Sequence, residues 1–588
     1  MQTYLFLMTI GPVQDFIAAA RRSRDLWAGS WLLSELSRRA AGALRDTGAT
    51  LIFPAQKDLD AHEVVNRLLV ETSLPPVELG PRIETVVRDH LRAQANKIFM
   101  QIRGLRDEPS LAKQALQQVE ELLEIFWVGM ARTEHYQQDR DLLEAALAAR
   151  KNTRDFHQPG YAAMVPKSSI DGARESVIPE RYFPRPGADE RERERSQQQL
   201  LALFGAKKAE RLSGVDLLKR HLPGTGGVTD FPSTSHFAAL PWLYRHQQFA
   251  AAFDAYLKDV QKYVQPEGIH PQRFQQLNLL QGSDASILFA ERLSEEVDAA
   301  DLNESQGRLC DLYSAIGSQP EPYYAILHAD GDRMGQVIDT LAQAPDGREQ
   351  HQRFSRALDT FAGGVRAIVE SANHRGALVY SGGDDVLAFL PLDTVIPCAK
   401  ELAEHFANAL RGYTNSEGLW PTLSVGVAII HHLEPLSSAL DLARSAEKVA
   451  KRTRNALAII LSKRSGADTT ISGGWQSGFV ERMERFTLLH QEDAFPDGAA
   501  FELRNLDERV GRVLPADALI AEALRILKRK RAHHGQRALQ GADFTMIEQA
   551  LRNGARQQPA WGINELADEL IVAREFARAR GIQQKEER

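Results

Sequence analysis

Cysteine is scarce in this chain, and its scarcity excludes two kinds of site. Only Cys310 and Cys398 occur among the 588 residues. Two cysteines so far apart in the sequence build neither a disulfide framework nor a zinc site made of cysteines. We therefore expect a protein of a reducing compartment, the cytoplasm, held together by apolar packing.

Long apolar runs and an excess of positive charge are also missing. No stretch reaches the roughly 18 uninterrupted apolar residues that indicate a membrane-spanning helix, and the first residues are typical of a strand rather than of a signal peptide. The net charge of −7 argues against a protein that wraps bare nucleic acid with its whole surface, although local basic patches stay open. A chain of 588 residues exceeds a single hydrophobic core, so we expect about three to four domains.

The most informative segment is Ser-Gly-Gly-Asp-Asp at 381–385. It lies between two apolar runs, 376–380 and 386–390, which predicts a β-hairpin with the motif at its turn. Two adjacent carboxylates at the tip of a rigid hairpin can hold Mg²⁺ or Mn²⁺, and two glycines let a phosphate chain approach the backbone closely. The alternative is a polar hairpin turn that binds nothing.

A second acidic motif lies upstream. The apolar run 323–327 leads into Asp330 and Asp332, which are therefore expected at the C-terminal end of a strand. Two-metal catalysis needs acidic ligands from separate elements, because one turn cannot surround two cations ~3.5–4 Å apart. Asp330 together with Asp384 and Asp385 meets that need, with Asp332 as a supporting or capping residue. The alternative for the upstream motif is a turn or a helix cap.

The elements predicted around these motifs follow the order β-α-β-β-α-β, and one further helix and one further strand come after it. They are a strand at 323–329, a helix at about 349–372, the hairpin at 376–390, a helix at 394–413, a strand at 422–430, a helix at 436–455 and a strand at 456–461. This order is typical of a ferredoxin-like fold. Its sheet would place Asp330 and the 384–385 pair on neighbouring strands.

The N-terminus repeats part of this plan. Residues 3–10 are predicted as a strand, Gly11-Pro12 as the start of a long helix, and 50–53 as a short return strand. When the two segments are overlaid, Ile10-Gly11-Pro12 falls on Asp330-Gly331-Asp332 and supplies no carboxylate. We therefore expect a degenerate copy that acts only as a partner surface.

These residues resemble the palm domain shared by polymerases and by diguanylate and adenylate cyclases. More broadly, the chain resembles the large, polymerase/cyclase-like subunit of the type III-B (Cmr-type) CRISPR effector complex. The stretches that carry this resemblance are 10–36, 149–156, 167–177, 210–220, 323–335, 381–390 and 455–466. The resemblance implies an antiviral, RNA-guided protein in which target RNA switches on the synthesis of cyclic oligoadenylates from ATP.

For this chain the resemblance implies a metal-dependent nucleotidyltransferase. Asp330, Asp384 and Asp385 are expected to hold Mg²⁺ or Mn²⁺. Three glycines are expected to line the ATP: Gly331, Gly382 and Gly383. Lys451 and Arg454, at positions where the cyclase relatives carry phosphate-binding cations, would hold its β- and γ-phosphates. The alternative for these two cations is stabilisation of a helix C-terminus.

The chain departs from the family in two respects. No His-Asp dipeptide occurs, so the DNA-cutting HD-type nuclease of many relatives is not expected from this polypeptide. Two cysteines cannot form the four-cysteine zinc module of other relatives, so no structural zinc is expected.

The expected architecture is α+β, with two ferredoxin-like palm domains and helical domains between and after them. The expected boundaries are 1–235 for the degenerate N-terminal palm with insertions, 236–320 for a helical domain, 321–470 for the catalytic palm and 471–588 for a C-terminal helical domain.

The expected partners are other effector subunits, guide and target RNA bound through the complex, and ATP, with no membrane. Alternative functions stay open: transfer of AMP to S-adenosylmethionine, a scaffold with an inactive palm that binds guide RNA and other subunits, or a free-standing cyclase of the diguanylate type. The intact acids argue against the scaffold, and the family-like stretches outside the second palm argue against the free-standing cyclase.

Overall fold

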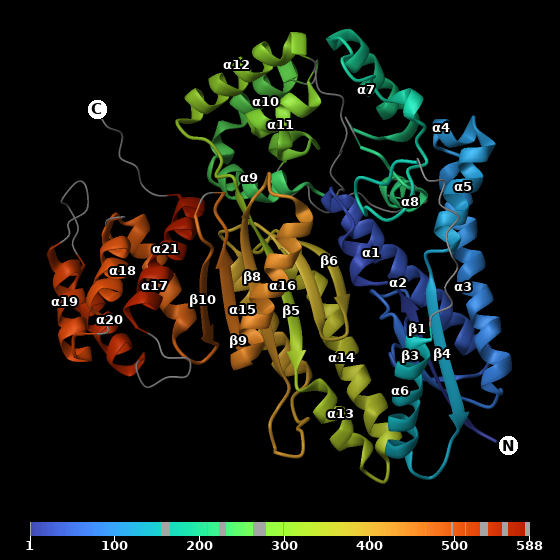
Figure 1. Ribbon diagram of the computed structural model, residues 1–588. Coiled ribbons are helices and arrows are strands. Elements are labelled where there is room, and N and C mark those ends of the chain that lie inside the picture. The colour runs from blue at the N-terminus through green and yellow to red at the C-terminus, as the bar shows by residue number, and fades with distance from the viewer. Residues whose placement is uncertain are drawn as a thin grey trace.

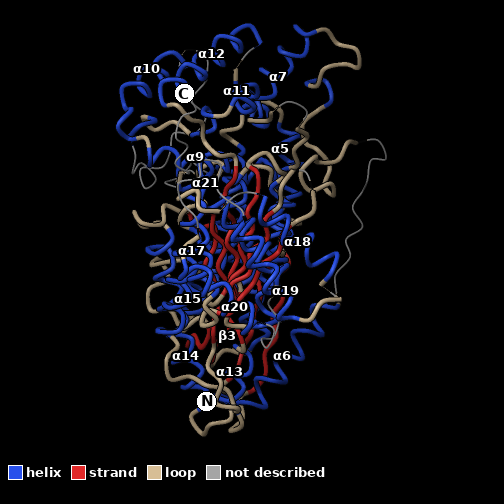
Figure 2. The backbone as a smooth tube through the Cα atoms, turned by 90° about the vertical axis from the view of Figure 1, so that its left-hand side faces the viewer, coloured by secondary structure: helices blue, strands red, loops and turns tan. Residues whose placement is uncertain are grey.

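Two β-sheets organise the structure, and helices cover both faces of each (Figure 1). The computed structural model describes residues 2–153, 165–207, 210–222, 231–260, 262, 278–297, 299–464, 466–495, 498–511, 513–529, 539–554 and 562–581. Seen from the side, the strands run through the middle of an elongated molecule, with helices along its flanks and at one end (Figure 2). Within these ranges no helix is long and apolar enough to cross a lipid bilayer.

The first sheet has four antiparallel strands in the order β2-β3-β1-β4. Its strands are β1 (Tyr4–Gly11), β2 (Thr50–Phe53), β3 (Arg67–Thr72) and β4 (Glu124–Ala131). Helices α2 (Ser23–Asp46) and α3 (Pro76–Phe99) cover one face, and α6 (Tyr136–Asn152) covers the other. Further helices pack around α2 and α3, either directly or through one another. They are α1 (Gln14–Ala18), α4 (Arg103–Arg106), α5 (Pro109–Glu120), α7 (Glu190–Phe204) and α8 (Gly214–His221).

The second sheet has six strands in the order β10-β9-β8-β5-β7-β6. Its strands are β5 (Tyr323–Asp332), β6 (Ala377–Gly382), β7 (Asp385–Leu390), β8 (Thr422–His431), β9 (Ala456–Leu461) and β10 (Thr469–Gly474). Helices α14 (Gly347–Val369) and α15 (Val395–Ala409) cover one face, and α16 (Leu436–Thr453) packs on the other. A short helix, α13 (Met334–Ala342), follows β5 directly.

The two sheets share one topology. In the second sheet, four successive strands, β8-β5-β7-β6, repeat the order and antiparallel pairing of β4-β1-β3-β2 in the first. This is the ferredoxin-like arrangement. The expected α+β fold with two such domains is confirmed. Strand β9 adds to β8 in parallel after α16, and β10 extends the sheet beyond the predicted elements.

The overlay of the two strand ends places side chains on the wrong face of the sheet. In β1 the side chains that pack under the covering helices are even-numbered, as at Met8 and Ile10, whereas in β5 they are odd-numbered, as at Leu327 and Ala329. Because side chains alternate along a strand, Ile10 faces the covering helices, and the position of Asp330 is taken by an odd-numbered residue of β1. The expected long helix after Pro12 is also corrected, since it is divided into α1 and α2.

Helical segments lie at the two remaining sides of the second sheet. Helices α9 (Thr234–Arg245), α10 (Ala250–Val260), α11 (Ala290–Glu296) and α12 (Ala299–Ile316) gather at the top of Figure 1. The C-terminal helices lie beside β10: α17 (Phe479–Gln491), α18 (Gly498–Val510), α19 (Ala516–Arg529), α20 (Gly541–Gly554) and α21 (Ile563–Arg580). The expected domain boundaries stay a proposal.

The loop between β2 and β3 fastens the first sheet to α14 of the second domain. His62 Nε2 lies 2.6 Å from Asp359 Oδ1, and the backbone N–H of Ala55 donates to Ser355 Oγ across 2.8 Å. Close packing between the two domains is therefore reinforced by hydrogen bonds over a sequence separation of about 300 residues. As a result, this loop lies against the hairpin of β6 and β7, where Val65 approaches Gly383.

Helix α16 lies flush against β8 at a single glycine. A Cβ atom added to Gly426 would lie 2.0 Å from the backbone nitrogen of Glu447. Gly426 pairs with His328 on β5, so this contact fixes the height of α16 above the strand that ends in Asp330. The distance between α16 and the sheet thus depends on the absence of one methyl group.

We expect Gly426→Ala to destabilise the protein by ~1–3 kcal/mol, the usual range for overpacking a tight contact. Thermal unfolding followed by circular dichroism measures the effect. Gly42→Ala is the matched control, because a Cβ at Gly42 in α2 meets no atom within 4 Å and alanine favours a helix. An unfolding temperature of Gly426→Ala at or above that of wild type would contradict the flush packing.

Candidate functional site

Strand pairing brings the predicted acidic residues together at one end of the second sheet. Ala329 of β5 pairs with Val386 of β7 in antiparallel register. The next position on each strand places Asp330 beside Asp385, on the same face of the sheet. Asp384 lies one residue further on, in the turn between β6 and β7. The prediction that Asp330 and the 384–385 pair lie on neighbouring strands is confirmed.

The hairpin turn consists of two residues, Gly383 and Asp384, because Gly382 pairs with Asp385. Only Gly383 has a positive φ, 69°, which is the conformation that favours glycine at the first central position of a type II′ turn. Gly382, expected to line the nucleotide, lies beside the ring of Tyr380. A Cβ there would lie 1.7 Å from the hydroxyl of Tyr380, so the space at Gly382 is filled by this ring. The open side of the turn is at Gly383.

Gly331 allows the two strands' acids to approach. A Cβ at Gly331 would come within 2.8 Å of both Cβ and Oδ2 of Asp384. The absence of a side chain at 331 therefore lets the Asp384 carboxylate lie directly over the end of β5. Any larger residue at 331 would displace it.

The carboxylates of the hairpin are crowded. Burial and the charges of Asp330 and Asp385 raise the pKa of Asp384 to about 7. Burial and the charges of Asp330 and Glu447 raise the pKa of Asp385 to about 7. Asp385 still exposes 38% of its side chain, so its carboxylate is surrounded by protein on most sides and remains in contact with water. Its Oδ1 has no hydrogen-bond partner among the described residues, although His328 Nε2 lies 3.4 Å away.

Lys451 supplies the positive charge in this cluster. Its Nζ lies 2.5 Å from Asp330 Oδ2 and donates to the carbonyl oxygen of Gly331 across 2.7 Å. Burial alone would lower the pKa of Lys451, but the hydrogen bond to Asp330 and the charges of Asp330 and Asp332 raise it above its ordinary value. The side chain therefore stays protonated, and it neutralises Asp330 from the last turn of α16.

Arg454, the second predicted phosphate-binding residue, is placed differently. It follows α16 with φ 60°, and its backbone N–H donates to Ala450 O across 2.8 Å. Its side chain is exposed and makes no hydrogen bond or ion pair within the described part of the chain. The structure thus brings Lys451 into the acidic cluster, whereas Arg454 lies at its margin.

Asp332 is a structural residue. It is 1% exposed and accepts hydrogen bonds from Thr422 Oγ1, at 2.7 Å, and Ser424 Oγ, at 2.9 Å. The backbone N–H of Asn455 donates to the same carboxylate across 2.9 Å. With these partners Asp332 ties β5 to β8 and to the start of β9. Asp330 is then the acid of β5 that faces the hairpin.

Two further residues of the cluster were missed in the sequence. Glu447 lies one helical turn before Lys451, and burial raises its pKa, with Asp330 adding to the effect. His328 lies two residues before Asp330 on the same face of β5, and burial lowers its pKa. The period of two along β5 could have indicated His328, but nothing local indicates Glu447, since its place depends on how α16 packs.

The donor set fits a divalent cation chemically. Three carboxylates from two neighbouring strands, one with an unsatisfied oxygen, are the ligands that Mg²⁺ and Mn²⁺ prefer. No group of three or more His, Cys, Asp or Glu side chains in the described ranges is already arranged around one point, however. Lys451 forms an ion pair with the Asp330 carboxylate. Cation binding by Asp330, Asp384 and Asp385 therefore requires that this ion pair loosens.

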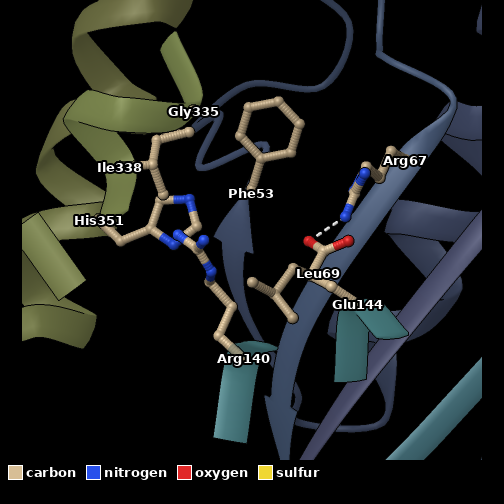
Figure 3. Close-up of a pocket in the computed structure, with 8 residues that line it drawn as sticks. All are labelled: Phe53, Arg67, Leu69, Arg140, Glu144, Gly335, Ile338 and His351. Atoms are coloured by element: carbon tan, nitrogen blue, oxygen red, sulfur yellow. Dashed lines mark ion pairs between the residues drawn. The ribbon is translucent and has the colours of Figure 1, made fainter. Parts of the chain in front are cut away.

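A cavity of about 260 Å³ lies between the two domains, close to the end of β5 (Figure 3). It is lined by Phe53, Arg67, Leu69, Arg140, Glu144, Gly335, Ile338 and His351. Arg140 is 9% exposed, and its Nε and Nη1 have no hydrogen-bond partner among the described residues, while its Nη2 binds Asp339. Figure 3 shows the guanidinium of Arg140 beside the His351 ring, with the Arg67–Glu144 ion pair on the other side.

His351 presents a neutral ring to this cavity. Burial, together with the charges of Arg140 and Arg67, lowers its pKa to about 3. Its Nδ1 lies 2.8 Å from the hydroxyl of Tyr136, whose own pKa is raised by burial. The cavity thus offers unused guanidinium N–H groups next to aromatic rings, which suits a ligand with both hydrogen-bond acceptors and a flat apolar surface.

Two ferredoxin-like sheets, with acids on the ends of two neighbouring strands of one of them, define a protein with two palm domains. Residues 323–458 match the family described as "Cas10/Cmr2, second palm domain", and residues 5–131 match "CRISPR-associated protein Cmr2, N-terminal". Over these two segments the chain is similar to the Cas10/Cmr2 family, as its sequence suggested.

One curated relative and two solved structures are similar to the chain. The chain is 27% identical over 573 residues to "CRISPR system Cmr subunit Cmr2" of Pyrococcus furiosus, covering 80% of this chain and 63% of that protein's length. The fold is similar to a subunit of "Type III-B Cmr-beta" in its apo state, with a TM-score of 0.65, 13% identity and coverage of 90% and 78% of the two chains. The same assembly bound to cognate target RNA gives a TM-score of 0.67 at 13% identity, with 98% and 83% covered.

The crowding of the hairpin acids predicts a pH-dependent cost in the metal-free protein. Asp384 and Asp385 titrate near 7 in the folded chain, against 3.8 when unfolded, so the folded state binds more protons between about pH 4 and pH 7. Stability from these groups is present below that window and is lost as the pH rises through it. We expect Asp384→Asn with Asp385→Asn to raise the unfolding temperature in EDTA, little near pH 4.5 and more at about pH 8.

Excess Mg²⁺ is the internal control, because a cation offsets the same repulsion and should shrink the difference at about pH 8. Unfolding temperatures of wild type and variant, measured across the pH range with and without Mg²⁺, decide the matter. A gain that is the same at every pH would show that the acids do not repel one another in the folded protein.

Proposed function

We propose that this chain is a metal-dependent nucleotidyltransferase that makes cyclic oligoadenylates from ATP inside a type III-B effector complex when target RNA is bound. The observation that carries the proposal is the gathering of Asp330, Asp384 and Asp385 at one end of a palm-type sheet, with Lys451 among them. Similarity to the Pyrococcus relative, which is named as a Cmr subunit, supports it. The chain spans 63% of that relative's length.

The chemistry is a displacement at the α-phosphorus of ATP. A bond forms between a ribose 3′-oxygen and this phosphorus, the bond to pyrophosphate breaks, and the hydroxyl proton passes to solvent. Divalent cations supply charge neutralisation for the leaving pyrophosphate and lower the pKa of the attacking hydroxyl. Asp330, Asp384 and Asp385 would hold these cations, because their mutual repulsion makes them a strong site for positive charge.

Lys451 would then serve the triphosphate. With a cation on Asp330, the ammonium group of Lys451 would be released from that carboxylate, at the end of β5 beside the backbone of Gly331. A protonated lysine at this place can pair with the β- or γ-phosphate. Arg454 stays a proposed second contact from the margin of the site.

Joining nucleotides requires a place for a second one. The cavity between the domains, with the free N–H groups of Arg140 and the ring of His351, is the place we propose for part of that acceptor. Its wall at Gly335 begins three residues after Asp332, in the first turn of α13. An acceptor held there would approach the hairpin from the side of the N-terminal domain.

The proposed setting is a complex with other effector subunits, guide RNA and target RNA. S-adenosylmethionine as the acceptor of AMP is a second candidate for the reaction, because its adenine and charged groups also suit a cavity lined by Arg140, Glu144 and aromatic rings. Product masses from the assembled complex with target RNA, ATP and Mn²⁺, with and without S-adenosylmethionine, distinguish the two reactions.

The hairpin acids provide the decisive test. We expect Asp384→Ala with Asp385→Ala to abolish nucleotide synthesis by the assembled complex while leaving assembly intact and the unfolding temperature no lower than that of wild type. Liquid chromatography with mass detection measures the product, and circular dichroism measures unfolding on the same preparation. A purely scaffolding palm predicts that the wild-type complex makes no nucleotide either. Synthesis near the wild-type rate in the double variant would refute the catalytic role.

Lys451→Ala tests phosphate binding separately. Loss of one charge-assisted contact should cost ~1.5–3 kcal/mol, so ATP should bind roughly 10- to 150-fold more weakly. Isothermal titration with ATP and Mg²⁺ measures the affinity. Lys448→Ala is the matched control, since Lys448 lies on the same helix with an exposed side chain. Equal affinities for the two variants would return Lys451 to a purely structural role.

A further inference from the structure

The outer edge of the first sheet lacks the features that normally protect an edge strand. Strand β4 ends the sheet and pairs with β1 over eight consecutive residue pairs without a bulge. Its sequence, EIFWVGMA, contains no lysine, arginine or proline, and its only charge is Glu124 at the start. Folded proteins usually protect a free edge with charges, prolines, bulges or short strands, because unpaired strands recruit other chains.

The direction of each backbone group of β4 follows from one hydrogen bond. The N–H of Arg132 donates to the carbonyl oxygen of Thr3 across 2.8 Å, which makes this a bonded pair of the ladder. Bonded and non-bonded pairs alternate in an antiparallel ladder, so the even-numbered residues of β4 bond to β1. The odd-numbered residues direct their N–H and C=O groups to the free edge: Ile125, Trp127, Gly129 and Ala131. None of these groups is hydrogen-bonded to another backbone group in the part of the chain that the structure describes.

Exposed aliphatic side chains flank this edge on both faces. Val77 is 73% exposed and follows Pro76, which lies against Gly129 of β4 at the start of α3. Leu142 is 60% exposed on α6. Glu144 of α6 pairs with Arg67 on β3, and Leu142 lies about 200° away around the helix, on the side toward β4. The free backbone groups thus lie between two apolar contacts.

We propose that the edge of β4 accepts an extended strand from another protein subunit, which continues the sheet by one strand. The partner class rests on the proposed function, in which the chain works within an effector complex. Outward N–H and C=O groups would bind the incoming backbone, while Val77 and Leu142 would contact its alternating side chains. Strand 124–131 itself carries no lysine or arginine, and Arg150 of α6 lies over the ring of Phe126, 5.7 Å from its centroid. The free N–H and C=O groups of the edge complement a polypeptide backbone rather than a phosphate chain.

Hydrogen exchange with mass detection tests the pairing directly. In the isolated chain, segment 124–131 should hold its four β1-bonded amides and exchange its four outward amides rapidly. In the complex made by co-expression with the other effector subunits, all eight should be protected. Protection already present in the isolated monomer would show that the chain covers its own edge. Protection that appears only in a homo-oligomer would assign the edge to a second copy. Rapid exchange in both samples would leave no added strand. Each of these three outcomes overturns the proposal.

Two variants test whether the edge is needed for assembly. Ala131→Pro removes one outward N–H and leaves the ladder to β1 intact, and Ala131→Val is its control because it keeps the N–H. Leu142→Asp places a charge beside the edge, with Leu514→Asp in the C-terminal helical segment as the control at an exposed leucine. We expect at least a tenfold loss of assembled complex for Ala131→Pro and Leu142→Asp, with unchanged unfolding temperatures. Wild-type assembly by both would overturn the proposal.

Assembly is measured by size-exclusion chromatography without nucleotide. Failure of this proposal is therefore distinguishable from failure of the proposed function. A complex that assembles through β4 and makes no nucleotide refutes only the catalytic role. A complex that makes nucleotide with β4 unpaired refutes only the docking role.

Discussion

Repulsion among carboxylates held in place by a sheet is the constraint on which the site depends. Backbone pairing fixes Asp330 beside Asp385, and the absence of a side chain at Gly331 brings Asp384 over the same strand end. None of the three can move away without breaking strand pairing. Lys451 offsets part of the negative charge of these carboxylates. It lies on α16, whose distance from the sheet is set by the close contact at Gly426. The acidic end of the sheet is therefore a strained arrangement that added positive charge relieves.

The same constraint separates the roles of neighbouring acids. Asp332 and Asp330 are two residues apart on one strand, yet Asp332 is enclosed by Thr422, Ser424 and the backbone of Asn455. Its hydrogen bonds align β8 and β9 with β5, which in turn places the end of α16. Among the described residues, Asp330 forms an ion pair with Lys451, and its carboxylate becomes available when that pair loosens. Asp332 thus holds the strands in place, and Asp330 faces the hairpin acids from the end of β5.

Much of this arrangement could be predicted from the sequence, because it depends on local patterns. The apolar runs around Gly382-Gly383 specify a hairpin, and the order of strands and helices specifies which strands are neighbours. The overlay of β1 on β5 put side chains on the wrong face, since the short segment 10–12 carries no signal of which face the helices cover. The packing of the Tyr380 ring at Gly382 could not be predicted either, because it accompanies an irregularity in the pairing of β6 that sequence patterns do not reveal.

Contacts between distant segments could not be predicted. Glu447 joins the cluster only because α16 packs flush on β8, and Arg140 meets His351 only because the two domains lie against each other. No spacing in the sequence links residues that are about 200 positions apart. The β10 strand was missed for a similar reason, since its short sequence, TTISGG, becomes a strand by pairing with β9.

The neutral state of His351 has a consequence for the cavity between the domains. An imidazole whose pKa is about 3 does not change charge in ordinary buffers. The side of the cavity formed by His351 is therefore uncharged from mildly acidic to alkaline solution. Ligand binding in the cavity should therefore not depend on protonation of His351, whereas cation binding at the hairpin should depend on protonation of Asp384 and Asp385.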